Sequence, residues 1–137
     1  PTGAFLSVEG SPFDFREMKK IGDGIHCDNA QLKLGGTYDH NFVINGDGLR
    51  EAAVLQSKES GIRLTCFTDQ PGVQLYVPCY TLHQKRIDGK DYPPYSAVCL
   101  ETQHYPNAIN IEHFPSVVLK AGENFRSKTL YHFSVMG

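Results

Sequence analysis

A glutamate that follows an apolar run is the residue of this sequence best suited to acid–base chemistry. Glu101 comes after Ala97-Val98-Cys99-Leu100, at a position where alternation predicts a β-strand. Burial there would raise the pKa of a carboxylate towards neutrality, which suits a general base. The same pattern also fits an outward-facing glutamate on a half-exposed strand, flanked by Thr102 and Gln103. Periodicity alone leaves both interpretations open.

Three further polar residues are candidates for binding a hydroxyl-rich ligand. Asp39 lies in a polar, glycine-led stretch, where its carboxylate would either accept hydrogen bonds from a ligand or cap a turn. Gln70 and Gln74 straddle Pro71-Gly72, and a side-chain amide offers a neutral polyol both a donor and an acceptor. Simple surface exposure is the alternative for both glutamines.

Other catalytic classes lack their signatures. The 6 histidines show no H-x-x-x-H spacing, and the 4 cysteines are widely spaced without a C-x-x-C pair, so we expect no metal site. Reduced structural thiols are the favoured state, with two disulfides as the alternative. There is no G-x-S-x-G and no G-x-x-x-x-G-K, which argues against a serine hydrolase and a phosphate-binding loop.

Short alternating runs separated by turn residues predict an antiparallel all-β protein from about Asn41 onward. The expected strands are Ile62–Thr68, Gly72–Val77, Ser96–Gln103, Phe114–Leu119 and Phe125–Val135. The expected turns are Asn45–Gly48, Ser60–Gly61, Pro71–Gly72, Asp88–Gly89 and Ala121–Gly122. One short helical turn is expected over Phe13–Lys20, after Ser11-Pro12.

Length and charge restrict the class of protein further. A chain of 137 residues fits one segment, 1–137, with one core. The net charge is −2 and the 13 basic residues are scattered, so we expect no nucleic-acid partner. No long apolar run or signal peptide is present, so we expect no membrane contact and a soluble, cytoplasmic protein. The start at Pro-Thr-Gly suggests a segment of a longer protein, and a processed independent domain is the alternative.

Five motifs in order along the chain resemble those of the aldose 1-epimerase family, also called galactose mutarotases. They are SPFDFR (11–16), YDHNF (38–42), TDQPGVQLY (68–76), CLETQHYPNAIN (99–110) and FPSVVLKAGENF (114–125). This resemblance implies the C-terminal part of a large antiparallel β-sandwich, the mutarotase supersandwich. It also implies interconversion of the α and β anomers of galactose or glucose without a cofactor.

The resemblance assigns roles to three residues. Glu101 of the E-T-Q motif corresponds to the family base that takes the proton from the anomeric hydroxyl, and Asp39 and Gln74 correspond to sugar-binding residues. The family's acid histidine, its partner histidine and a sugar-binding arginine belong to motifs upstream of SPFDFR, and nothing in this chain matches them. We therefore expect the N-terminal remainder of the same protein to supply the acid. His40 and His104 adjoin family motifs without occupying the position of the acid.

One departure and two rival functions remain open. Val77-Pro78-Cys79-Tyr80 replaces a Gly-Asn pair common in the family, and Pro78 fixes φ and removes a backbone donor, so sugar preference is in doubt. A catalytically silent carbohydrate-binding or regulatory domain is the main alternative. A relative that acts on a hexose phosphate would need clustered cations, which Arg63, Lys85 and Arg86 do not form in the sequence.

Overall fold

Strands dominate the chain, as the alternating pattern predicts. The computed structural model describes residues 2–137. The strands are β1 Asp39–Val43, β2 Arg50–Gln56, β3 Ile62–Thr68, β4 Gly72–Tyr76, β5 Leu82–Lys85, β6 Asp91–Tyr92, β7 Cys99–Gln103 and β8 Thr129–Val135. The helices are α1 Ile21–Gly24, α2 Ala30–Gly35 and the 3₁₀ helix η1 Ala108–Asn110. The sheet orders are β1-β4-β7, β2-β3-β8 and β5-β6, and the all-β expectation is confirmed.

The chain divides into two compact units. Unit 1 consists mainly of Asn41–Gln74 and Leu100–Gly137, and unit 2 of Ala4–His40 and Leu75–Cys99. The described residues include no helix long and apolar enough to cross a membrane.

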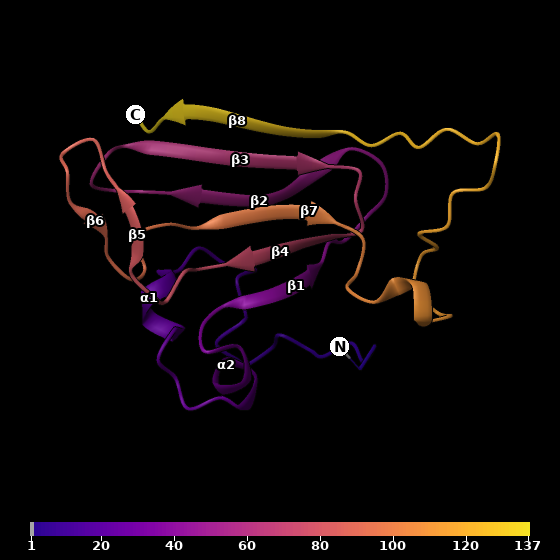
Figure 1. Cartoon of the computed structure of the whole chain (residues 1–137), viewed down its shortest axis with the longest axis horizontal. Coiled ribbons are helices and arrows are strands. Elements are labelled where there is room, and N and C mark those ends of the chain that lie inside the picture. The colour runs from indigo at the N-terminus through magenta and orange to yellow at the C-terminus, as the bar shows by residue number, and fades with distance from the viewer. Residues whose placement is uncertain (1) are drawn as a thin grey trace. The chain divides into compact units, whose positions relative to one another are not determined.

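The sheet β2-β3-β8 of unit 1 is built around its central strand β3. β3 pairs antiparallel with β2 on one side and with β8 on the other, from Ile62↔Val135 to Thr68↔Thr129 (Figure 1). Branched and aromatic residues favour this strand because they pack well on a pleated surface. Its C-terminal half is its buried part, with Cys66 at 0 % exposure. Burial raises the pKa of the Cys66 thiol.

Two of the expected turns form tight hairpins. Between β2 and β3, the amide of Gly61 donates to the carbonyl of Ser57 at 2.9 Å, and Gly61 adopts φ +71°. Between β5 and β6, the amide of Gly89 donates to the carbonyl of Arg86 at 2.9 Å, with φ +78°. Positive φ is inexpensive only for glycine, so both turn predictions are confirmed with their physical reason.

Arg50 fixes the loop between β1 and β2. Its guanidinium donates to four backbone carbonyls, those of Ile44, Asn45, Gly48 and Thr68, over distances of 2.9 to 3.1 Å. The side chain of Arg50, the first residue of β2, thus binds carbonyls of the loop and of the last residue of β3, and it fixes the loop to the sheet β2-β3-β8.

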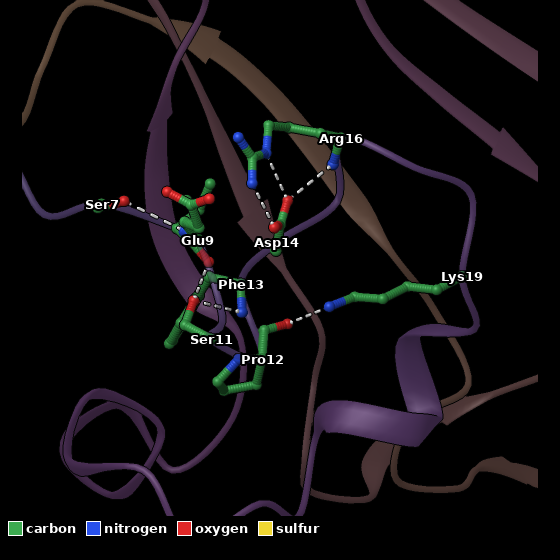
Figure 2. A network of polar contacts seen from close by, with 9 residues as sticks. Ser7, Glu9, Ser11, Pro12, Phe13, Asp14, Arg16 and Lys19 are labelled. Carbon is green, nitrogen blue, oxygen red and sulfur yellow. Dashed lines mark hydrogen bonds and ion pairs between the residues drawn. The ribbon is translucent and has the colours of Figure 1, made fainter.

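The SPFDFR segment in unit 2 is a hydrogen-bonded loop, so the helical turn expected over Phe13–Lys20 is wrong. Asp14 accepts two side-chain hydrogen bonds from Arg16, at 2.8 and 2.7 Å, and the ammonium of Lys19 donates to the carbonyl of Pro12 at 2.8 Å (Figure 2). The hydroxyl of Tyr38 donates to the same carbonyl at 2.9 Å. These contacts hold the segment in place without the i→i−4 hydrogen bonds of a helix.

The helices of unit 2 come later in the sequence than expected. α2 is capped at its start by the side chain of Asn29, which accepts from the amide of Gln31 at 2.9 Å. It ends at Gly36, whose φ of +69° terminates a helix at little cost. Leu32 provides the buried contact of this helix.

The strand expected over Phe114–Leu119 is also wrong. Phe114 packs its ring against Tyr105 at 4.9 Å, and the residues that follow are exposed and irregular. Pro115 offers no backbone donor to a sheet, and the hydroxyl of Ser116 accepts from the amide of Val118 at 3.2 Å, which bends the chain. Two other strands start later than expected, at Cys99 and Thr129.

Candidate functional site

The three predicted site residues lie on the three strands of one sheet. Asp39 opens β1, Gln74 is the central residue of β4, and Glu101 is the central residue of β7, in a sheet of order β1-β4-β7. Asp39 and Glu101 are exposed, and Gln74 is half-buried. Gln74 and Glu101 belong to unit 1 and lie on neighbouring strands, whereas Asp39 is the first residue of β1 and belongs to unit 2.

Glu101 is exposed, which agrees with the outward-facing alternative that the pattern left open. Leu100 and Thr102, directly before and after it, are half-buried. Because successive strand residues alternate between faces, Leu100 and Thr102 share the face opposite Glu101. Cys99 and Gln103, which share the face of Glu101, are half-buried as well, so Glu101 is the exposed residue of this strand. Its role as a base remains a prediction.

Hydroxyl groups connect β7 to β8 within unit 1. The hydroxyl of Tyr131 donates to the carbonyl of Leu100 at 2.7 Å. The hydroxyls of Thr102 and Thr129 lie 2.6 Å apart, and that of Thr129 lies 3.1 Å from the hydroxyl of Thr68. Sequence reasoning did not identify these residues, and their only sequence signal is that Thr129 and Tyr131 lie in phase on one strand.

Gln70 belongs to the interior of unit 1 and not to a ligand surface. It is 7 % exposed, and its side-chain amide donates to the hydroxyl of Ser127 at 2.6 Å. Asp69 accepts from the same hydroxyl and from the amide of Lys128, both at 3.0 Å. The backbone bond from Lys128 is the main cause that lowers the pKa of Asp69. These contacts tie the segment before β8 to the end of β3.

Asn41 and Gly72 lie beside Gln74 in unit 1. A Cβ added at Gly72 would come closest to Oδ1 of Asn41 and would lie 3.2 Å from both its Cγ and its Nδ2. The Asn41 amide therefore lies directly over Gly72, on the face of β4 that Gln74 also occupies two residues later. Along β1, Asp39 and Asn41 share a face for the same reason. Nδ2 of Asn41 is buried and has no hydrogen-bond partner among the described residues.

In unit 2, Asp39 has two tyrosines in its neighbourhood. The hydroxyl of Tyr76 donates to that of Tyr80 at 3.0 Å. This bond is the first cause that raises the pKa of Tyr76 to about 12, and the negative charge of Asp39 adds to the shift. Pro78 is buried, and its carbonyl accepts from the amide of Tyr95 at 2.6 Å. Val77-Pro78-Cys79-Tyr80, which departs from the family pattern, therefore ends in a tyrosine whose hydroxyl is hydrogen-bonded to Tyr76, the last residue of β4.

The described histidines show no arrangement that replaces the family's acid. His40 packs edge-on against Phe13, with ring centroids 4.6 Å apart, and burial lowers its pKa. Because it follows Asp39 on β1, its side chain points to the opposite face from that carboxylate. His113 bonds to the carbonyl of Gly3 at 3.0 Å. Within residues 2–137, no three His, Cys, Asp or Glu side chains gather as metal ligands, and the four cysteines are free thiols.

The sheets define a mainly antiparallel β-protein, and the comparisons identify its family. The family model described as aldose 1-epimerase matches residues 1–132, so the chain belongs to the aldose 1-epimerase family. It is 40% identical to a galactose mutarotase of Bos taurus over 139 residues, which cover 98% of this chain and 39% of that protein. It is 31% identical to an aldose 1-epimerase of Escherichia coli (strain K12), again over 39% of the relative.

Solved structures agree with this assignment. An aldose epimerase homologue from C. elegans superposes on the whole chain with a TM-score of 0.83 and 30% identity, using 41% of its own length. A galactose 1-epimerase from Lactobacillus acidophilus NCFM covers 96% of the chain with a TM-score of 0.79 and 29% identity. The chain thus spans about two-fifths of the length of the proteins it matches.

Proposed function

We propose that this chain supplies the base and sugar-binding residues of an aldose 1-epimerase that interconverts the α and β anomers of a free hexose, galactose or glucose. The observation that carries the proposal is the match of the aldose 1-epimerase family model to residues 1–132, together with Gln74 and Glu101 on the neighbouring strands β4 and β7 of unit 1. The relatives named galactose mutarotase and aldose 1-epimerase support the same substrate class. The free thiols fit a reducing compartment, and we include the cytoplasm in the proposal.

In the proposed reaction Glu101 takes the proton from the anomeric hydroxyl as the ring C–O bond breaks. The electron pair of that bond goes to the ring oxygen, which needs a proton because an alkoxide is a poor leaving group near neutral pH. A histidine from outside this chain delivers that proton. The open aldehyde then rotates about its bond to the next carbon, and closure returns both protons. No cofactor takes part in this proposal.

Binding falls to the side chains around the base. The carboxylate of Asp39 accepts hydrogen bonds from sugar hydroxyls, and the amide of Gln74 both donates and accepts. The exposed position of Glu101 leaves its carboxylate accessible to a sugar. The free amide group of Asn41, beside Gly72, adds a buried donor on the same face of β4.

Polarimetry with fresh α-galactose or α-glucose tests the enzyme directly. We expect accelerated mutarotation, and a loss of about 10²- to 10⁴-fold in Glu101→Gln, the range for removal of a general base. Glu112→Gln, an exposed glutamate outside the sheets, is the matched control and should leave the rate unchanged. Mutarotation by Glu101→Gln at the wild-type rate would refute the role of the base. Intact mass of the purified protein, compared with 15.3 kDa, establishes whether further sequence accompanies the chain.

A catalytically silent carbohydrate-binding domain is the second candidate. It is favoured by the packing of His40 against Phe13, which keeps this imidazole from replacing the acid. Calorimetry with galactose, glucose and their phosphates separates the two functions. Hexose binding without accelerated mutarotation supports the silent domain, whereas acceleration that depends on Glu101 supports the epimerase. Preference for a sugar phosphate would contradict both.

A further inference from the structure

The residues directly before and after Glu101 are each tied to β8. The hydroxyl of Tyr131 holds the carbonyl of Leu100 at 2.7 Å, and the hydroxyl of Thr129 lies 2.6 Å from that of Thr102. The two bonds come from positions two apart on β8 and reach positions two apart on β7. Glu101 is therefore the residue enclosed between two cross-sheet hydrogen bonds.

These bonds leave the carboxylate accessible. The side chain of Thr102 faces β8, and alternation turns the side chain of Glu101 to the opposite face. Its exposure agrees with this orientation. The ties consequently restrain the backbone on either side of the glutamate without covering the group that would accept the proton.

β7 has a structural need for such restraint. It is a strand of five residues, and its hydrogen-bonded neighbour within residues 2–137 is β4. A short strand has few hydrogen bonds to fix it, and small displacements of a catalytic group are costly to the rate. β8, which belongs to the other sheet, supplies the additional support.

The hydroxyl of Thr129 is itself held in place. Thr68, its other neighbour at 3.1 Å, accepts a hydrogen bond from the amide of Gln70 at 3.0 Å. Since a hydroxyl has one proton and two lone pairs, the bonds form a chain from Gln70 through Thr68 and Thr129 to Thr102. Burial raises the pKa of Tyr131.

We propose that Thr129 and Tyr131 are positioning residues that fix Glu101 for proton transfer in the epimerase reaction. This inference depends on the proposed function, because it assigns a purpose to holding that carboxylate still. Each of the two residues acts through the backbone or side chain of a neighbour of Glu101.

The test measures mutarotation kinetics of the protein with single hydroxyl removals. Tyr131→Phe and Thr129→Val each delete one bond with little change of shape, and we expect kcat to fall about 5- to 10-fold while KM stays within twofold. Thr129→Ser keeps the hydroxyl and should recover most of kcat. Tyr92→Phe and Thr81→Val, exposed positions in unit 2, are the matched controls. Urea unfolding of each variant identifies any that lose rate by unfolding.

The outcomes separate this inference from the proposed function. An active wild type with unchanged kcat in both variants would overturn the positioning role and leave the epimerase intact. Equal losses in Thr129→Val and Thr129→Ser would also overturn it, because the hydroxyl would then be irrelevant. A wild-type protein that neither binds hexose nor accelerates mutarotation would refute the proposed function and this inference together.

Discussion

Replacing Gly72 by alanine should have opposite effects on stability depending on residue 41. Gly72 is buried in β4, and its φ is not in the left-handed region, so alanine is acceptable to the backbone. The new methyl group would instead collide with the Asn41 amide, whose Cγ and Nδ2 would both lie 3.2 Å away, with Oδ1 closer still. The conflict is therefore steric and local to one pair of residues.

The magnitude follows from two opposed terms. Overpacking of a fitted site costs about 1–3 kcal/mol, whereas glycine to alanine lowers the entropy of the unfolded chain and gains about 0.4–1 kcal/mol. We expect Gly72→Ala to lower the free energy of unfolding by about 0.5–2 kcal/mol as the difference of those terms. In an Asn41→Ala background the collision disappears, so the same change should stabilise by about 0.4–1 kcal/mol.

Urea denaturation of the wild type, both single variants and the double variant measures this coupling as a double-mutant cycle. The m-value should stay constant, so that midpoints report stability directly. The reasoning would be refuted if Gly72→Ala destabilised the protein equally in both backgrounds. That result would mean that the methyl group collides with something other than Asn41.

Two further predictions concern unit 2. The hydrogen bond from Arg16 lowers the pKa of Asp14 from 3.8 to about 2 in the folded state. The ionised Asp14 carboxylate therefore stabilises the folded protein above the unfolded-state pKa. This stabilisation is lost as the pH falls through the folded-state pKa. Between pH of about 4 and 2, the free energy of unfolding should therefore fall less steeply with pH in Asp14→Asn than in the wild type. Glu9→Gln is the control. Equal pH dependence in Asp14→Asn and the wild type would contradict the role of this ion pair. Tyr80→Phe removes the acceptor of the Tyr76 hydroxyl, so ultraviolet titration should show the pKa of Tyr76 moving down from about 12. The ratio of galactose to glucose kcat/KM should change by about 2- to 10-fold in the same variant, and an unchanged ratio would remove this tyrosine pair from sugar recognition.

The sequence predicted those strands whose own residues favour a strand. β3 matches its predicted bounds, because Ile62–Thr68 alternates and is rich in branched residues. β2 was missed because it contains a glutamate and two alanines, which favour helices, and it is a strand through its pairing with β3. α2 was missed although Asn29 and Gly36 are the residues that cap it.

For the site, the candidate residues came from the family resemblance, and their spacing in the sequence did not show that their strands would be neighbours. Asp39, Gln74 and Glu101 are widely separated in sequence, and only the pairing of β4 with both β1 and β7 puts their strands side by side. The pattern around Glu101 did not decide between burial and exposure, because apolar neighbours on a strand belong half to one face and half to the other. The bonds from Thr129 and Tyr131 were not predictable either, since strands of different sheets make them.

The pairing of β3 with β8 also affects the order in which the sheet forms during translation. The threonines that join the two strands, Thr68 and Thr129, are separated by 61 positions, so this pairing closes a long loop. A ribosome releases β2 and β3 as a ready hairpin well before their third strand exists, and contacts of such long range form slowly. The bonds of Thr129 and Tyr131 to the neighbours of Glu101 therefore form only after β8 has been translated.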